Sequence, residues 1–282
     1  MELGEFLKSR RARLQPADAG LPSHGERRRV PGLRREELAQ LAGVSAAYYT
    51  RLEQGQSRNA SDAVLEALAR VLRLDEDERT HLLTLARPGR RPQRPAPREQ
   101  LRSEVRVMIE SFRDVPALVL GRRTDILAWN RMAHALLARH LDFGAPERTA
   151  DRPNWTRMFF LDPQLRELFT AWPDKARDTV ADLRMIAGRY PDDSRLAALI
   201  GELAMKSAEF ARLWAQHSVR GCASHSREYH HPVAGRLTLT DELLALTDEG
   251  QRIAVFTAEP GSPSEAALGL LAPPRQANGR PT

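Results

Sequence analysis

The sequence predicts a multidomain protein in which an all-α domain of five helices precedes an α+β domain with an antiparallel sheet. Three observations support this prediction. Residues 1–86 place their apolar side chains at helical spacing, residues 87–99 are rich in proline and arginine, and residues 100–272 combine short β-prone runs with helical segments. The length of 282 residues is sufficient for two separate cores. Residues 87–99 are therefore expected to be an extended linker.

Composition and charge narrow the class of protein. The chain is 41% hydrophobic and 28% charged, which is typical of a globular protein, and it lacks an apolar run long enough to span a bilayer. The first residues show no signal region, so we expect a cytoplasmic protein that does not enter a membrane. Residues 1–98 contain 19 basic and 13 acidic residues, whereas the rest contains 24 of each. This local excess predicts that the first domain binds a polyanion.

The five helices of the first domain follow from spacing and end signals. Ser61 is a candidate N-cap, and Asp75 with Glu78 resembles a capping box. A loop marked by proline and glycine separates the first helix from the second. The helices are expected in residues 3–14, 35–42, 46–54, 61–74 and 75–86.

A break at Gly43 separates two segments that each have a clear helical pattern. Before it, Leu38, Leu41 and Ala42 fall on one helical face, and Gly43 permits backbone angles that other residues resist. Val44 is expected to return an apolar group to the core. These features predict a tight turn between two short helices.

The helix after the break is expected to be a recognition helix. Ser45 can cap it, Tyr49 and Leu52 face inward, and small Ala39 lets the two helices cross closely. Ala46, Ala47, Thr50, Arg51 and Gln54 are then expected to face outward. This spacing is typical of a helix-turn-helix, whose second helix enters the major groove of double-stranded DNA. The alternative is an ordinary helical hairpin, which the basic excess and the outward face without large hydrophobes disfavour.

The candidate DNA contacts divide by chemistry. Small alanines permit close approach and contact thymine methyl groups, whereas Thr50 and Arg51 can reach base edges. Arg34, Arg35, Arg58 and the run 27–29 are better placed as phosphate contacts. The full candidate set is Arg34, Arg35, Gln40, Ser45, Ala46, Ala47, Tyr48, Thr50, Arg51, Gln54, Arg58 and Asn59.

The second domain alternates in character along the chain. Residues 100–112 predict a helix, and residues 116–121 and 125–130 predict a strand pair. Helical patterns occupy residues 131–217, with breaks at 146–154 and 190–194. Three more strands are expected at 226–231, 235–247 and 251–259, and residues 273–282 are expected to form a disordered tail.

Both halves resemble a known family. The stretch "PGLRREELAQLAGVSAAYYTRLEQGQSRNASDAVLEALARVLRLDEDER" is similar to the Xre-type helix-turn-helix of the MmyB-like transcription regulators. The segments "ILAWNRMAHALL", "SAEFARLWAQHSV" and "YHHPVAGRLTL", with the long segment beginning "RPNWTRMFFLDPQ", resemble their C-terminal domain. Ala60 departs from the proline that related proteins often have. The resemblance implies a PAS-like domain with a hydrophobic cavity in which a fatty-acid-like molecule can lie.

The residues that would line such a cavity are apolar or aromatic. Aromatic residues at helical spacing more often form core, so only the resemblance favours a pocket. Asn130 and Arg184 are candidates for polar contact, although Arg184 is equally explained as a solvated helix residue. The candidate set is Trp129, Asn130, Met132, Leu136, Phe159, Phe160, Leu183, Arg184, Phe210 and Trp214.

The sequence gives weaker evidence for a metal site or for catalysis. Cys222, His225, His230 and His231 do not form a familiar zinc pattern, and His231 before Pro232 is better explained as fixing a turn. The sequence has no nucleophile elbow, phosphate-binding glycine loop or metalloprotease motif, so we expect no catalysis and no required cofactor.

The sequence therefore predicts a DNA-binding transcription regulator that works as a homodimer and responds to a hydrophobic small molecule. A dimer is expected because a helix-turn-helix usually pairs two half-sites. The alternative is a protein-interaction or metal-sensing regulator whose second domain serves dimerisation.

Overall fold

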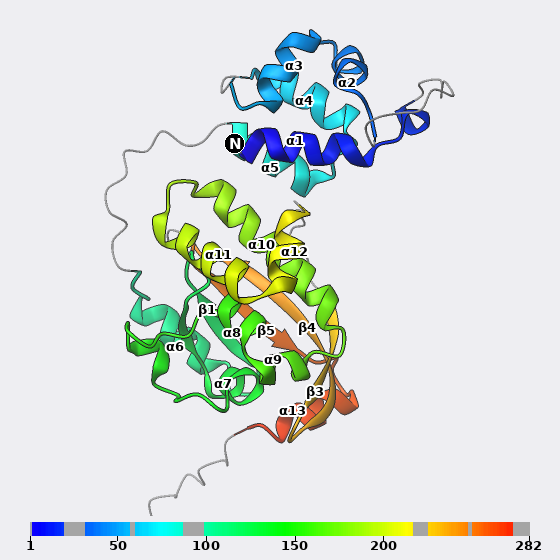
Figure 1. Ribbon diagram of the computed structural model, residues 1–282. Coiled ribbons are helices and arrows are strands. Elements are labelled where there is room, and N and C mark those ends of the chain that lie inside the picture. The colour runs from blue at the N-terminus through cyan, green and yellow to red at the C-terminus, as the bar shows by residue number, and fades with distance from the viewer. Residues whose placement is uncertain are drawn as a thin grey trace, which may run out of the picture. The chain divides into compact units, whose positions relative to one another are not determined.

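The structure is a computed structural model, shown in Figure 1, and it describes residues 2–19, 32–56, 60–86, 99–216, 225–247 and 250–272. The chain divides into two compact units. The first comprises Met1–Arg91, Val180–Ser194 and Arg212–Gly221, and the second comprises Pro92–Thr179, Arg195–Ala211 and Cys222–Thr282. The predicted domain boundaries at residues 86 and 100 remain predictions. Among the described residues, no helix has the length and apolar character needed to cross a membrane.

The five expected helices of the first unit are present, together with a short 3-10 helix, η1 (Pro16–Ala19). Ser61 caps its helix by accepting a hydrogen bond from the Val64 amide at 3.4 Å. Asp75 and Glu78 form the expected capping box, in which the Glu78 amide donates to the Asp75 carboxylate at 2.8 Å. The five helices are α1 (Glu2–Arg13), α2 (Arg35–Leu41), α3 (Ala46–Glu53), α4 (Asp62–Val71) and α5 (Glu76–Ala86).

The helices of the first unit pack around one apolar core. Its most buried members are Phe6, Leu7, Leu33, Leu38, Tyr49, Leu52, Leu65, Leu68 and Leu82. The prediction for Leu41 is wrong, since this side chain is 37% exposed. Leu38, Ala39 and Ala42 define the buried arc of α2, and Leu41 lies about 110° from the centre of that arc in a helix with about 100° between residues.

The second unit contains a five-stranded antiparallel sheet with the strand order β2-β1-β5-β4-β3. The sheet confirms the expected antiparallel α+β arrangement, including the pair formed by the first two strands. The strands are β1 (Ala117–Leu120), β2 (Ile126–Trp129), β3 (His225–His231), β4 (Gly235–Ala245) and β5 (Arg252–Thr257).

The two faces of the sheet carry different cores. On one face, Val119 and Ile253 pack with Val105 and Ile109 of α6 (Ser103–Ser111). The opposite face carries Tyr229 and Phe256, whose rings lie 6.5 Å apart and face an aromatic cluster described below. Because side chains alternate along a strand, Ile253 and Phe256, three residues apart on β5, lie on opposite faces of the sheet.

Helices occupy much of residues 131–215 as expected, but with further breaks at residues 138–144, Asp162, residues 169–171 and Ser207. One helix, α13 (Pro263–Gly269), was not expected, although Ser262, Pro263 and Glu265 form a recognisable helix start. The predicted linker up to residue 98 and the predicted tail lie outside the described residues. The remaining helices are α7 (Arg131–Leu137), η2 (Ala145–Glu147), α8 (Trp155–Leu161), α9 (Pro163–Leu168), α10 (Trp172–Arg189), α11 (Ser194–Lys206) and α12 (Ala208–Ala215).

Candidate DNA-binding and ligand-binding sites

The turn between α2 and α3 has the geometry that the sequence predicts. Gly43 has a φ of +69°, in the left-handed region that favours glycine. The Val44 amide donates to the Ala39 carbonyl at 2.9 Å, and the Gly43 amide donates to the Gln40 carbonyl at 3.2 Å. These two bonds form a Schellman motif, which satisfies carbonyls at the end of α2 and redirects the chain.

Helix α3 is defined at both ends and anchored along one side. The Ser45 hydroxyl accepts a hydrogen bond from the Tyr48 amide at 3.1 Å, which confirms the predicted N-cap. Tyr49 and Leu52 are fully buried, also as predicted. Gly55, with a φ of +71°, ends the helix. The opposite side of α3 is consequently held in a fixed orientation.

That opposite side is polar and accessible. Ala47, Arg51 and Gln54 are exposed, and Tyr48 and Thr50 are half-buried. The prediction for Ala46 needs correction, because its side chain is half-buried and packs against the core rather than facing fully outward. Ser45, Arg34 and Gln40 are exposed as expected. Arg58, Asn59 and the arginine run 27–29 lie outside the described residues, so their assignments stay predictions.

Arg35 has a structural partner that the sequence did not reveal. Its Nε donates to the Glu53 carboxylate at 3.0 Å, and its Nη2 lies 2.9 Å from the same oxygen. Its side chain is nevertheless 43% exposed. A phosphate contact from Arg35 therefore stays a prediction, and it would compete with this ion pair.

Glu53 and Arg11 form a buried ion pair behind the recognition helix. Arg11 donates from Nε and Nη2 to the two carboxylate oxygens at 3.0 and 2.9 Å. Burial opposes ionisation of Glu53, but hydrogen bonds and charge from Arg11, with help from Arg35, lower its pKa below the usual value. Burial likewise raises the pKa of the adjacent Tyr49 phenol. The partners are 42 residues apart, and no local pattern indicates the pair.

In the second unit, the predicted ligand-binding residues are mostly core. Trp129, Met132, Leu136, Phe159 and Phe210 are at most 4% exposed. The structure brings together Phe159, Phe160 and Phe210, whose neighbouring rings are 5.2 and 5.1 Å apart. Trp129 instead contacts His134 and donates its indole hydrogen to the Phe143 carbonyl.

Asn130 acts as a structural hub. Its side-chain oxygen accepts hydrogen bonds from the Ala117 and Ala133 amides, and its nitrogen donates to the carbonyls of Ile109, Phe112 and Val115. The hydrogen bond from the Ala133 amide caps the N-terminus of α7. Because the amide is already saturated, the structure favours a positioning role, and ligand contact by Asn130 stays a prediction.

Leu183, Arg184 and Trp214 fall in the first unit. Arg184 is 8% exposed, so the interpretation of a solvated residue is wrong. Its guanidinium carbon lies 4.0 Å from the centroid of the Trp214 ring, and it donates to the Trp214 carbonyl. This contact ties α10 to α12.

Two buried polar groups stand out in the aromatic core. The Tyr229 hydroxyl and the Trp172 indole nitrogen have no hydrogen-bond partner among the described residues. Trp172 stacks on Phe159 with ring centroids 5.2 Å apart, and Phe169 lies 5.0 Å from Tyr229 and 5.5 Å from Phe159. The two donors thus border one continuous aromatic cluster, where an unsatisfied donor is costly.

The histidines of β3 do not form a metal-binding cluster with other described residues. The His231 ring accepts hydrogen bonds at Nδ1 from the Val233 and Ala234 amides, at 3.2 and 3.1 Å. Its Nε2 donates to the Ala135 carbonyl at 3.1 Å. The predicted role in fixing the turn is thereby confirmed. Cys222 lies outside the described residues, and the described part of the chain brings no three metal-ligating side chains together.

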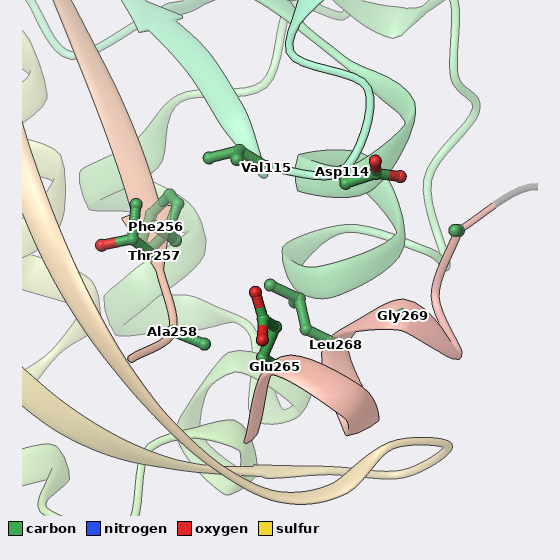
Figure 2. A pocket seen from close by; sticks show the side chains of 9 residues that line it. Asp114, Val115, Phe256, Thr257, Ala258, Glu265, Leu268 and Gly269 are labelled. Atoms are coloured by element: carbon green, nitrogen blue, oxygen red, sulfur yellow. The ribbon is translucent and has the colours of Figure 1, made fainter. Parts of the chain in front are cut away.

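A separate pocket of about 570 Å³ opens beside α13 (Figure 2). None of the predicted ligand-binding residues lines it. Its walls are the segment before β1, the end of β5 and α13 itself. The lining residues are Asp114, Val115, Phe256, Thr257, Ala258, Glu265, Leu268, Gly269 and Ala272.

The capped, one-sided α3 behind a glycine turn defines a helix-turn-helix protein. Comparison with protein families agrees, since residues 2–82 match a helix-turn-helix domain. Residues 101–271 match the MmyB-like transcription regulator ligand binding domain. The chain belongs to the MmyB-like transcription regulators, as the resemblance implied, and is a DNA-binding regulator rather than a member of an enzyme family. A comparison with curated proteins found no match.

Proposed function

We propose that α3 recognises a specific operator in double-stranded DNA and that a hydrophobic ligand in the second domain controls this binding. The observation that carries the first part is the rigid setting of α3, which is capped by Ser45 and buried along Tyr49 and Leu52. This setting presents Ala47, Thr50 and Arg51 on one accessible side. The protein acts in the cytoplasm as a homodimer that spans two half-sites.

Base recognition and phosphate contact fall to different residues. Arg51 is exposed on α3 and has the bidentate geometry that guanine O6 and N7 accept. Arg34, exposed before α2, is suited to a phosphate. Arg51→Ala should cost about 1–3 kcal/mol of DNA-binding free energy and relax the sequence preference at one base pair. Arg34→Ala should instead weaken binding to all DNA sequences equally.

Binding titrations with selected operator and scrambled DNA, at several salt concentrations, test this proposal. Affinity should fall steeply with salt because bound phosphates release counterions. Arg177→Ala, an exposed arginine on α10, is the matched control and should bind as the wild type does. Salt-insensitive binding, or equal loss in Arg177→Ala, would favour a protein-interaction role for the first domain.

The proposed ligand is a fatty-acid-like molecule beside the aromatic cluster. Tyr229 and Trp172 support it, since two buried donors that have no partner in the described part of the chain can be satisfied by an acceptor such as a carboxylate. Ligand occupancy would regulate DNA binding by favouring one of two arrangements of the dimer, which requires different ligand affinities for the two.

Solvent extraction of the purified protein followed by mass spectrometry tests the ligand proposal. An acyl molecule near one per chain is the expected result, with lower occupancy in Tyr229→Phe, which removes one donor. Sedimentation of the same sample measures the dimer. A protein without organic ligand that contains stoichiometric zinc would support the metal-sensing alternative.

A further inference from the structure

We infer that the pocket beside α13 binds a small organic cation, an ammonium group carried on a compact apolar body. Its volume of about 570 Å³ lies within the range of ordinary small-molecule sites, roughly 300–1,000 Å³. Three walls from distant parts of the chain form it, namely residues 114–115, residues 256–258 and α13 with Ala272. This proposal does not depend on the acyl ligand proposed above.

The charge of the lining selects for a cation. Its two ionisable side chains are the carboxylates of Asp114 and Glu265, and no basic residue is among the described residues that line the pocket. Figure 2 shows the Glu265 carboxylate extending from α13 toward Val115, whereas the Asp114 carboxylate on another wall points away from Glu265; both side chains are exposed. An ammonium group beside Glu265 would donate charge-assisted hydrogen bonds to a carboxylate that no basic residue of the described lining neutralises, and the negative charge of Asp114 would add to the attraction.

Glu265 is held in place for this role. One of its carboxylate oxygens accepts a hydrogen bond from the Gly261 amide at 2.7 Å, and its own amide donates to the Ser262 hydroxyl at 3.2 Å. These bonds fix the first turn of α13 and leave the second carboxylate oxygen able to accept from a ligand. A preorganised acceptor loses little conformational freedom on binding.

The apolar part of the lining determines the body of the ligand. Phe256 and Leu268 are buried, at 3% and 4% exposure, and Val115 lies beside them in Figure 2. The Phe256 ring can pack against the apolar body of the ligand and can also attract its adjacent ammonium group. A metal ion is disfavoured, since two carboxylates supply few of the six to eight oxygen ligands that calcium takes. A fatty-acid carboxylate would meet like charge here.

Calorimetric titration of the full chain with phenethylamine, which is protonated at neutral pH, tests the proposal. Neutral 2-phenylethanol and anionic phenylacetate carry the same ring and should bind at least about tenfold more weakly, because each lacks the charge-assisted bond. Glu265→Gln keeps an acceptor for the Gly261 amide and should weaken phenethylamine binding about tenfold. Glu259→Gln removes an exposed carboxylate outside the lining and should leave affinity unchanged.

Three results would overturn the inference. The first is equal affinity for the amine and the alcohol, and the second is absence of binding by all three compounds. The third is saturable binding of calcium chloride that Glu265→Gln abolishes while the amine does not bind. Leu268→Trp, which fills the pocket from α13, gives an independent check, because it should abolish amine binding while circular dichroism shows an unchanged fold.

Discussion

The Arg11 guanidinium and the Glu53 carboxylate meet through two hydrogen bonds of 3.0 and 2.9 Å, and this pair ties α1 to the last residue of the recognition helix. Only 8% and 1% of their side-chain surfaces are exposed. Arg11 also donates to the Leu33 carbonyl at 2.7 Å, so one guanidinium holds the segment before α2 as well. The orientation of α3 therefore depends on a residue that does not belong to the helix-turn-helix.

Arg11→Met should destabilise the first unit by about 3 kcal/mol, because it removes the buried partner that makes two hydrogen bonds to the Glu53 carboxylate and leaves that charge buried. Denaturant unfolding, with hydrogen exchange of α1 and α3 to locate the change, measures the effect. Arg79→Met breaks the exposed Arg79–Glu66 pair and serves as the control, with little expected loss. The double variant Arg11→Met/Glu53→Gln should recover part of the stability. Similar losses of stability in Arg11→Met and Arg79→Met would contradict this prediction.

The same pair predicts an acid sensitivity. The pKa of Glu53 is lowered in the fold, since the bonds and charges of Arg11 and Arg35 outweigh the opposing effect of burial. A depressed pKa contributes stability that is fully present above the unfolded value of about 4.5 and is lost as the pH falls through the folded value. Thermal unfolding of the first unit should therefore shift to lower temperature in acid. In Glu53→Gln this dependence should be shallower, and an identical slope would refute the assignment.

The helix-turn-helix was predictable because its signals are local. Gly43, Ser45 and Tyr49 specify the turn, the cap and the buried side within seven positions of the sequence. The antiparallel strands were predictable for the same reason, since composition and turn residues mark each one. The prediction that Leu41 is buried is wrong because a seven-residue helix exposes any part of its apolar stripe that extends beyond its contact with the core.

The supporting contacts were not predictable, since they join distant parts of the chain. Nothing near Asn130 indicates that it will bind carbonyls at Ile109 and Val115, and its polarity suggested ligand contact instead. The pocket beside α13 likewise unites Asp114 with Glu265, two ordinary carboxylates when considered in the sequence. Such sites depend on tertiary placement, which local periodicity does not encode.

Gly4→Ala should destabilise the first unit although alanine favours helices. A β-carbon at Gly4 would lie 1.9 Å from the Glu53 carbonyl oxygen, so α1 and the end of α3 would have to separate. Gly201→Ala is the matched control, because α11 leaves open space around that position, and it should stabilise the protein by about 0.5–1 kcal/mol. Thermal unfolding of both variants measures the contrast. A stabilised Gly4→Ala would show that the two helices are not in close contact.

His231 predicts a pH-dependent turn between β3 and β4. Burial lowers the pKa of this imidazole, the bond to the Ala135 carbonyl opposes that shift, and the charge of Arg139 adds to it. With a folded pKa below the unfolded value of 6.5, the histidine contributes stability that is fully present above that value and is lost as the pH falls. Protonation at Nδ1 would also break the bonds from Val233 and Ala234.

Hydrogen exchange at the Val233 and Ala234 amides, corrected for intrinsic rates, measures this effect. Protection should decrease as the pH falls below the ordinary imidazole value of 6.5, because the folded pKa of His231 lies lower than that value. His231→Asn retains an acceptor that does not titrate, so its protection should not depend on pH. His230→Asn alters the exposed neighbour on the same strand and should keep the wild-type dependence. If His230→Asn abolished the dependence and His231→Asn did not, the proton would belong to the other ring.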